Sequence, residues 1–454
     1  MFPVEKIARI VQGKLLRRGA DTPTRAIHDS RLVRAGDLFV ALPGHRSNGH
    51  RYVADAFKRG ACAALLSDTK DLPGDARNVI VVADPLLALQ QLASAWRDTM
   101  TTALLVAITG SNGKTTVRNL LGHMLAAQAD TFVAPHNYNT EIGLPIAILS
   151  MPANTRFGVF ELGAERPGDI AALTRILRPS LGILTSVTAS HLEGFETIEA
   201  VASEKWSLAN DLPKDGAIIL NADSPHLLKR ASTACVPVIS SGLSSGDIRG
   251  QILQSVPSLK IRVSRHDTMI GCPLIGDHNA CNLLLAATAA NVLGMNWDLI
   301  SAQAATFEPI AHRLNPIQTS FGTILDDTYN ANPASMAAAL HVLSRFGDTD
   351  SVRLFVFGDM YGLGTDSARY HREVARLAVD LRIDTILPVG EAAISACRAG
   401  DAANVVLMPQ EEITGYVLAR HTPRQQTAQS MVILIKGSRA MALEALVEEL
   451  QLRC

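Results

Sequence analysis

An apolar run that breaks into a glycine-bracketed turn constrains the fold of this 454-residue chain more than any other stretch. Residues 104–109 read Leu-Leu-Val-Ala-Ile-Thr, which suits a buried parallel strand, and Gly110-Ser-Asn-Gly113 follows directly. Lys-Thr-Thr at 114–116 then leads into residues 117–127, where the apolar side chains have helical spacing. The sequence therefore predicts a strand, a turn and a helix in direct succession.

A turn of this kind can bind a polyphosphate. Glycines let backbone N–H groups approach the phosphates, the helix N-terminus adds a favourable dipole, Lys114 adds a cation, and the Thr115 hydroxyl is a ligand for Mg²⁺. The pattern departs from the full G-x-x-x-x-G-K-[ST] form, because Ile108 stands where that form has glycine. We interpret the stretch as a phosphate-binding loop for ATP that consists of Gly110, Ser111, Asn112, Gly113, Lys114, Thr115 and Thr116.

Composition narrows the class of protein. The formal net charge of -1 creates no general attraction to nucleic acid or anionic membranes, so anion binding must be local. The six cysteines are dispersed and form no C-x-x-C pair, which favours reduced thiols over disulfides or zinc. Because no apolar run reaches about 18 residues and the N-terminus has no apolar stretch of signal length, we expect a soluble cytoplasmic protein without membrane insertion.

The alternation of strand and helix patterns predicts an α/β protein with three domains. Residues 1–84 are expected to form a small α/β domain, and residues 85–310 a central domain whose mostly parallel sheet holds the phosphate-binding loop. Residues 311–454 are expected to form a Rossmann-like α/β domain. Residues 235–275 contain short alternating runs, which predict a small antiparallel addition to the central sheet.

Polar residues follow several of the expected strands. Glu161 ends the expected strand 158–162, and His191 follows the strand expected at 181–186. Because parallel strands end at one edge of a sheet, these side chains and Thr115 could surround Mg²⁺, although imidazole is an unusual ligand for that ion. Four expected strands of the last domain also end in polar or glycine-containing sequence, and this predicts a crevice along that edge.

In the first domain, two polar segments flank one short expected strand. They are Asp29-Ser30-Arg31 and the stretch from Gly44 to His50. A serine hydroxyl, an arginine fork and backbone amides there could hold a diphosphate. Taken alone, the same residues also fit a pair of solvated loops.

Together with further motifs, these residues resemble the Mur ligase family over essentially the whole chain. The motifs are T-G-S-N-G-K-T-T, F-E-L-G with Glu161, H-L-E-G-F with Lys205 downstream, G-D-H-N-A-C-N, D-D-T-Y-N-A-N-P and I-K-G-S-R. Within the family, they look most like the ligases that join D-alanyl-D-alanine to UDP-N-acetylmuramoyl-tripeptide in peptidoglycan precursor synthesis. The acceptor motif D-N-P-R of the ligases that add a diamino acid is not found.

The resemblance implies an ATP-dependent, ADP-forming amide ligase that works through an acyl phosphate. It implies two Mg²⁺ ions, one held by Thr115 and Glu161 and the other by His191. It also implies that CO₂ carbamylates Lys205, which turns a cation into an anion able to bind metal. The catalytic residues would be Lys114, His191, Lys205 and Arg313.

The resemblance further implies that the nucleotide contacts the phosphate-binding loop and His278, Asn279, Asn282, Arg313 and Asp327. The UDP-sugar would contact Ser30, Arg31, Asn48, Gly49 and His50, and the muropeptide Asn137, Asn139 and Thr140. The dipeptide would contact Tyr329, Asn330 and Asn332, and its carboxylate Lys436, Ser438 and Arg439. We expect a monomer that binds no nucleic acid.

Three residues depart from the usual family pattern. Trp206 replaces a small or acidic residue after the lysine, His312 replaces a glycine, and Gly362 replaces the glutamate of G-D-M-x-E-L-G. They leave two alternatives open. The chain could be a paralogue that joins a different amino acid or dipeptide, or a catalytically silent scaffold that binds nucleotide.

Overall fold

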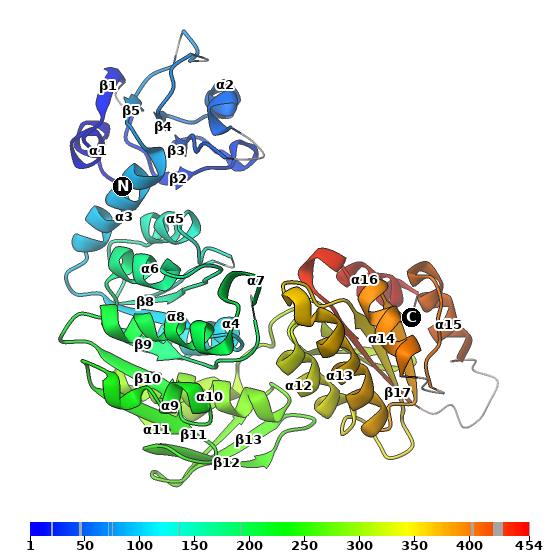
Figure 1. The fold of residues 1–454 in the computed structure, drawn as a ribbon. Coiled ribbons are helices and arrows are strands. Elements are labelled where there is room, and N and C mark those ends of the chain that lie inside the picture. Colours follow the sequence, from blue (N-terminus) through cyan, green and yellow to red (C-terminus); the bar gives the residue numbers. More distant parts are fainter. Residues whose placement is uncertain are drawn as a thin grey trace.

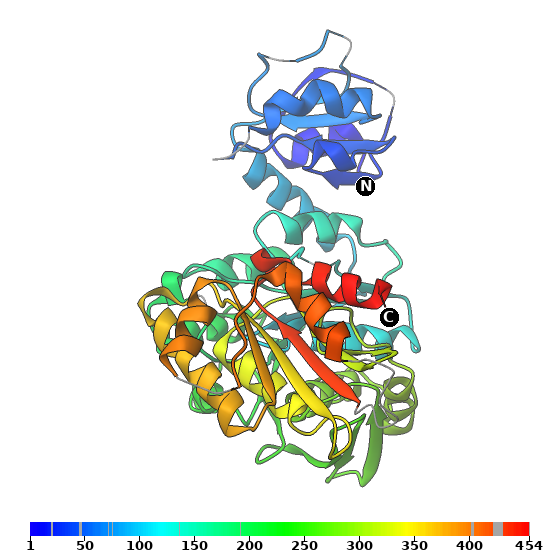
Figure 2. The same cartoon turned by 90° about the vertical axis from the view of Figure 1, so that its right-hand side faces the viewer.

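The computed structural model describes residues 1–19, 21–44, 48–70, 72–74, 76–135, 137–190, 192–400, 404–420 and 430–453. Within these residues, the chain forms three α/β units, each built on its own sheet (Figure 1). The N-terminal unit projects from one end of the molecule, and the C-terminal unit lies beside the central one (Figures 1 and 2). The α/β class and the three-part architecture are therefore as predicted, while the boundaries at 84/85 and 310/311 stay predictions.

The N-terminal unit has a five-stranded sheet in which only the edge strand β1 is antiparallel to its neighbour. In spatial order, the strands are β1 (Lys14–Arg17), β5 (Val79–Val81), β4 (Ala63–Leu66), β3 (Asp37–Val40) and β2 (Arg25–Ile27). Its helices are α1 (Val4–Ile10) and α2 (Val53–Lys58). Every side chain of β3 and β4 is buried, as expected for central parallel strands.

Helix α3 (Pro85–Asp98) connects this unit to the central one. It begins where Asp84 accepts hydrogen bonds from the N–H groups of Leu86 and Leu87, with proline at the first helical position. Near its end, the Trp96 ring packs edge-on against Phe2, while its indole N–H donates to the carbonyl of Met151. The connector is thus packed against both units.

The central unit has a nine-stranded sheet. In spatial order, the strands are β14 (Thr268–Cys272), β13 (Leu259–Val263), β12 (Ile248–Gln254), β11 (Val238–Gly242), β10 (Ala217–Asn221), β9 (Leu181–Leu184), β6 (Leu104–Thr109), β8 (Phe157–Glu161) and β7 (Thr131–Val133). All neighbours from β12 to β7 are parallel, whereas β12, β13 and β14 are antiparallel, which confirms the predicted antiparallel addition.

The helices of the central unit surround this sheet. They are α4 (Lys114–Ala126), α5 (Gly143–Ser150), α6 (Asp169–Leu177), α7 (Leu192–Phe195), α8 (Ile198–Asp211), α9 (Pro225–Leu228), α10 (Asp277–Val292) and α11 (Trp297–Ala305). Strand β6 lies between β8 and β9 and is parallel to both. The phosphate-binding loop begins at the carboxyl end of β6. That end therefore lies beside the end of β8, which carries Glu161, and the end of β9, which Thr185 follows.

The C-terminal unit has a five-stranded sheet. In spatial order, the strands are β15 (Asn315–Thr319), β16 (Gly322–Asp327), β19 (Met431–Lys436), β17 (Val352–Gly358) and β18 (Thr385–Val389). Its helices are α12 (Pro333–Leu343), α13 (Ser367–Asp380), α14 (Glu391–Ala399), α15 (Ile413–Arg420) and α16 (Glu444–Leu452). The four strands predicted here are parallel neighbours, so their ends do meet at one edge.

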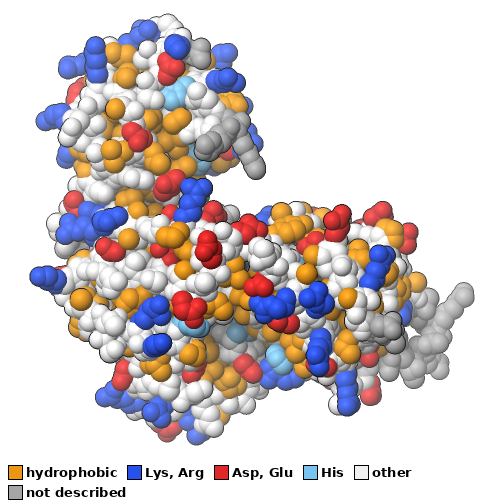
Figure 3. All heavy atoms as spheres, viewed as in Figure 1, with side chains coloured by type: hydrophobic (Ala, Val, Ile, Leu, Met, Phe, Trp, Pro, Cys, Tyr) orange, Lys and Arg blue, Asp and Glu red, His pale blue; other side chains and the backbone are white. Residues whose placement is uncertain are grey.

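On the face shown in Figure 3, acidic and basic side chains are intermixed, in keeping with the net charge of -1. Among the residues that the structure describes, none of the helices combines the length and apolar character that a membrane span requires.

Candidate active site

A cavity of about 890 Å³ has walls from the central and C-terminal units. It is lined by the whole phosphate-binding loop, by Glu161 and Lys205, and by the predicted nucleotide contacts at the start of α10. From the C-terminal unit come Arg313, Asp327, Lys436 and the loop after β16. The structure therefore gathers most of the predicted site residues around one space.

The phosphate-binding loop needs glycine at both ends. Gly110 has φ +150° and Gly113 has φ +85°, a region that L side chains rarely adopt. A Cβ atom on Gly110 would also clash with the Thr185 hydroxyl, and one on Gly113 with the side-chain oxygen of Asn282. The curl of the loop is thus set by close neighbours as well as by backbone freedom.

Lys114 folds back over this curl. Its ammonium donates to the carbonyl oxygens of Gly110 at 2.7 Å and Ser111 at 3.3 Å. Burial lowers the pKa of Lys114, while the nearby carboxylate of Glu161 opposes that change. The cation is held by carbonyl groups that a phosphate can replace.

Glu161 is the centre of a buried polar cluster. Its Oε2 accepts from the Thr115 hydroxyl at 2.9 Å and lies 3.7 Å from a guanidinium nitrogen of Arg118, while Oε1 accepts from Asn139 at 3.2 Å. Burial alone would raise the pKa of Glu161, but Lys114 and then Arg118 outweigh it, so the pKa lies below its ordinary value. The group is a carboxylate at neutral pH.

The oxygens of Thr115 and Glu161 are of the kind that hard Mg²⁺ prefers. Within the described part of the chain, no three His, Cys, Asp or Glu side chains gather closely enough to hold a metal ion. His191, the predicted second ligand, lies outside the described residues. Its role stays a prediction.

Lys205 lies on α8 and is only 2% exposed. Burial lowers the pKa of Lys205 to about 7, with a further contribution from Lys114, while Glu204 opposes the change. Its ammonium nitrogen lies 6.0 Å from the centroid of the Phe195 ring. Near neutral pH, a large fraction of this amine is therefore uncharged.

The asparagines at the start of α10 bond mainly within the protein. Asn279 donates to the carbonyl of Ile275 and accepts from Asn282, both at 2.9 Å. The Asn282 oxygen lies against Gly113, so the start of α10 packs closely on the phosphate-binding loop. His278 is exposed and lines the cavity.

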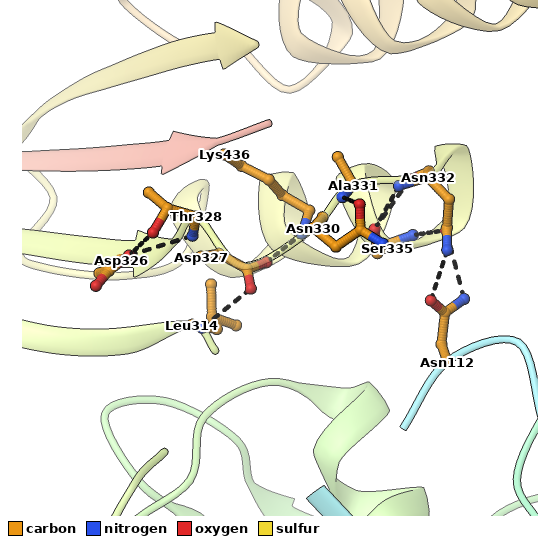
Figure 4. A network of polar contacts seen from close by, with 10 residues as sticks. All are labelled: Asn112, Leu314, Asp326, Asp327, Thr328, Asn330, Ala331, Asn332, Ser335 and Lys436. Carbon is orange, nitrogen blue, oxygen red and sulfur yellow. Dashed lines mark hydrogen bonds and ion pairs between the residues drawn. The ribbon is translucent and has the colours of Figure 1, made fainter. Parts of the chain in front are cut away.

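At the ends of β16 and β19, the predicted ribose contact and the predicted carboxylate partner bind each other (Figure 4). The Lys436 ammonium lies 2.6 Å from an Asp327 carboxylate oxygen and donates to the Asn330 carbonyl at 2.8 Å. Asp327 also accepts from the N–H of Leu314 at 3.1 Å. Burial lowers the pKa of Lys436, and Asp327 opposes the change.

The C-terminal unit touches the phosphate-binding loop directly. Asn332 donates to the Asn112 side-chain oxygen at 2.7 Å, and Asn112 donates back at 3.4 Å (Figure 4). Arg313 donates to the Thr115 hydroxyl at 3.1 Å, and its guanidinium lies 3.8 Å from the centroid of the Tyr329 ring. The Tyr329 hydroxyl donates to Asn137, so the predicted muropeptide loop is also contacted.

The remaining predicted substrate residues lie elsewhere. Arg31 is paired with Asp29 at 2.7 Å and lines a separate cavity of about 280 Å³ together with Arg25, Arg34 and Tyr138. The ring of His50 pairs with Asn48 at 2.7 Å and accepts from the N–H of Ser67 at 3.0 Å. Ser30 begins the 3₁₀ turn Ser30–Leu32, and Gly49 begins the turn Gly49–Tyr52.

The last two predicted residues, Ser438 and Arg439, follow β19. The Ser438 hydroxyl accepts from the N–H of Tyr361 at 2.8 Å, and Arg439 is paired with Glu444 at 2.7 Å. Tyr361 itself lines the large cavity.

Comparison with known proteins accounts for this arrangement. Residues 27–97 match the Mur ligase family catalytic domain, residues 108–290 the Mur ligase middle domain, and residues 312–439 the Mur ligase glutamate ligase domain. The UDP-N-acetylmuramoyl-tripeptide--D-alanyl-D-alanine ligase of Escherichia coli (strain K12) is 33% identical over 99% of this chain and 98% of its own length. This chain belongs to the Mur ligase family.

Other Mur ligases match over similar lengths. The ligase of the same description from Bacillus subtilis (strain 168) is 30% identical over 98% of each chain. A crystal structure of MurF from Acinetobacter baumannii superimposes with a TM-score of 0.90 at 29% identity, covering 99% of this chain and 98% of that chain. A second structure from that organism, a UDP-N-acetylmuramoylalanyl-D-glutamyl-2,6-diaminopimelate--D-alanyl-D-alanyl ligase, has a TM-score of 0.87 at 28% identity, covering 99% and 98%. The MurF ligase of Thermotoga maritima in complex with ADP has a TM-score of 0.83 at 26% identity, covering 94% and 97%.

The three departures from the Mur ligase pattern have different structural contexts. His312 has φ +62°, which explains why glycine suits this position, and its ring nitrogen Nδ1 lies 2.8 Å from an Asp326 oxygen. Gly362 has φ +74° and open space where a side chain would begin. Trp206 is buried in the core and is not among the described residues that line the cavity.

Sequence reasoning missed several polar residues of this Mur ligase site. Arg118 stands one helical turn after Lys114, and that spacing was a usable signal for its ion pair with Glu161. Thr188 bonds to Ser111 and Asn112, and no pattern marked it. Arg166 lines the cavity on the turn after β8, and Tyr361 on the loop after β17.

Proposed function

We propose that this Mur ligase joins D-alanyl-D-alanine to UDP-N-acetylmuramoyl-tripeptide and converts ATP to ADP and phosphate. The reaction belongs to peptidoglycan precursor synthesis. Full-length similarity to ligases of that description supports the proposal. The observation that carries it is the cavity in which Arg313 of the C-terminal unit reaches Thr115 of the phosphate-binding loop.

ATP would place its phosphates on the phosphate-binding loop, where Lys114 and backbone N–H groups are available. The Nε atom of Arg313 is buried and has no hydrogen-bond partner among the described residues. Such a donor fits a phosphate oxygen, because an unsatisfied buried N–H is costly. His278, Asn279 and Asn282 would lie near the base, and Asp327 near the ribose.

The chemistry has two steps. A terminal carboxylate oxygen of the tripeptide attacks the γ-phosphorus of ATP, the bond to the ADP oxygen breaks, and an acyl phosphate forms. The amino nitrogen of D-alanyl-D-alanine then attacks the acyl carbon, loses its proton, and phosphate leaves with the electrons of its carbon–oxygen bond. Lys114 and Arg313 stabilise the negative charge that moves between these groups.

The donor set fits Mg²⁺ at Thr115 and Glu161, because both offer oxygen and Glu161 is ionised. When bound, the ion would offset phosphate charge. His191 and a carbamate on Lys205 would hold a second ion. An uncharged Lys205 can form that carbamate, since its nitrogen attacks the carbon of CO₂ and then releases a proton.

The substrates would reach the cavity from opposite units. Ser30, Arg31, Asn48, Gly49 and His50 would hold the UDP-sugar, and Asn137, Asn139 and Thr140 the muropeptide. Tyr329, Asn330, Asn332, Lys436, Ser438 and Arg439 would hold the dipeptide. We propose that the protein is a monomer. We also propose that the peptide of its UDP-linked donor contains a D-glutamyl residue followed by a diamino acid.

Phosphate release with UDP-N-acetylmuramoyl-tripeptide tests the proposal. We expect release with D-alanyl-D-alanine, little with single amino acids and none without acceptor. Turnover with another amine in preference to the dipeptide would support the paralogue alternative. Binding of ATP without turnover for any amine would overturn the ligase proposal and leave the scaffold alternative.

A further inference from the structure

One cation of the large cavity is not used by the reaction described above. Arg166 is exposed and lines the cavity, and its guanidinium forms no hydrogen bond or ion pair with the described residues. In contrast, Lys114, Arg313 and Lys436 each bond to protein groups. Glu141 and Glu165 also line the cavity, but neither is paired with Arg166.

Arg166 stands on a turn that is held firmly in place. The carboxylate of Asp169 accepts from the N–H groups of Glu165 and Arg166, both at 2.9 Å. The buried carboxylate of Glu204 accepts from Gly168 at 2.8 Å and Ile170 at 2.7 Å. These bonds restrain the turn, so little backbone entropy is lost when Arg166 binds a ligand.

The same bonds decide which group on the turn can take an anion. The N-terminus of α6 would otherwise attract one, but Glu204 already accepts from the N–H groups of Gly168 and Ile170 there. On the turn itself, Asp169 accepts from those of Glu165 and Arg166. Among the described residues of the turn, the Arg166 guanidinium is thus a side-chain donor that no protein group engages. It presents a planar fork of N–H groups that matches a carboxylate.

The turn lies beside the route of the donor. It follows β8, whose last residue Glu161 bonds to Thr115. Arg166 is five positions after Glu161, which limits the distance between their Cα atoms to about 18 Å. Helix α6 packs against α3, the connector from the N-terminal unit (Figure 1). A peptide that reached from the N-terminal unit to the phosphate-binding loop would therefore have this wall of the cavity beside it.

We infer that Arg166 is a specificity-determining residue of the donor site, whose guanidinium binds a carboxylate of the donor peptide other than the one that is activated. This inference rests on the proposed function. A D-glutamyl residue retains one carboxyl group outside its peptide bond, and 2,6-diaminopimelate has two, of which only one is activated. The donor therefore offers two spare carboxylates of the same chemistry.

Steady-state kinetics with three donors tests the inference. The donors are UDP-N-acetylmuramoylalanyl-D-glutamyl-2,6-diaminopimelate, its analogue amidated at the glutamyl carboxylate, and its analogue amidated at the spare diaminopimelate carboxylate. For Arg166→Gln, we expect the KM of the unmodified donor to rise about tenfold or more, with a smaller change in kcat, because a charge-assisted pair is lost. Arg166→Lys should restore part of the affinity.

The amidated donors identify which carboxylate of the donor binds Arg166. One of them should raise the KM of the wild-type protein by a similar factor and should not raise the KM of Arg166→Gln further. Arg175→Gln is the matched control, since it removes an exposed arginine of α6, the helix that follows the turn, outside the cavity lining. It should behave as wild type, and all variants should have the thermal unfolding midpoint of the wild type.

If Arg166→Gln and Arg175→Gln have the same KM for the donor, the inference is overturned. Turnover by the wild-type protein would still support the proposed function. An equal further loss with both amidated donors in Arg166→Gln would also overturn the inference. If the wild-type protein converts none of the three donors, the proposed function and the inference fall together.

Discussion

The C-terminal and N-terminal units differ in where their predicted site residues make contacts. Arg313 and Asn332 reach across to Thr115 and Asn112 of the central unit. In the N-terminal unit, Arg31 is bonded within its own loop to Asp29, as is the ring of His50 to Asn48. Contact between units thus completes the large cavity on one side. On the other side, Arg31 lines a separate cavity, so under the proposed function the UDP-linked substrate would have to bridge the two.

This contrast predicts that the largest loss follows from a C-terminal residue that reaches the phosphate-binding loop. For Arg313→Ala, we expect kcat to fall about a hundredfold to a thousandfold, the usual cost of removing a group that stabilises transition-state charge. Binding of the UDP-linked donor should change little.

The matched control is Arg345→Ala. Its ion pair with Asp277 also connects the C-terminal and central units but is exposed, so activity should stay near wild type. Equal losses for the two variants would show that domain contact as such, and not charge at the phosphates, is what matters. The measurement is phosphate release at saturating substrates.

Lys205 is a buried residue of the central unit, and it extends the comparison to that unit. We expect Lys205→Ala to lower kcat about tenfold to a hundredfold, the range for groups that support a metal site, and a short carboxylate to restore part of the activity. Indifference to both changes would refute the carbamate.

The pH dependence of the carbamate has a defined sign. Because the pKa of Lys205 is about 7, against an ordinary value of 10.5, the uncharged amine becomes dominant above pH 7. The carbamate signal from ¹³C-labelled CO₂ should therefore grow as the pH rises from below to above 7, and it should be missing from Lys205→Ala. A signal that falls over this range would contradict the assignment.

Asn332 allows the contact between units to be weakened without loss of the helix cap. Its side-chain oxygen accepts from the N–H of Ser335 at the start of α12, and its amide nitrogen donates to Asn112. Asn332→Asp keeps the acceptor and removes the donor, so the unfolding midpoint should hold while the KM of the dipeptide rises about twofold to tenfold. A fall in stability without a change in KM would show that the contact serves only the fold.

We expect the smallest effect on stability from a substitution in the N-terminal unit. The pair of Arg31 with Asp29 is exposed, so Arg31→Ala should leave the unfolding midpoint unchanged. The KM of the UDP-linked donor should rise, with kcat at saturation preserved, because Arg31 is not among the described residues that line the large cavity. A change in kcat would show that Arg31, like Arg313, affects the chemical step.

Local patterns predicted much of the fold. The strand at 104–109 is β6, and the helix after the phosphate-binding loop begins at Lys114, a few residues before the predicted start. The strands that were missed, such as β2 and β7, have three residues each, and β7 is only half-buried throughout. So short a segment carries too little periodicity to be distinguished from a loop.

The sequence predicted those site residues whose positions follow from the ends of neighbouring strands. Glu161 lies beside Thr115 because β6 and β8 are parallel neighbours, a relation that strand-end reasoning anticipates. The pairing of Lys436 with Asp327 depends on β19 lying beside β16. The sequence separates those strands by a long stretch, so that partner could not be named in advance.

By itself, the sequence determined the phosphate-binding loop, because glycines at 110 and 113, a lysine and a helix start create a phosphate cradle through local backbone geometry. Only the tertiary structure decided which charges neutralise one another and which stay free for a ligand, as Lys436 and Arg166 illustrate. The physical reason is that charge pairing falls off over a few ångströms, and such proximity arises from strand order and domain packing between residues far apart in the chain.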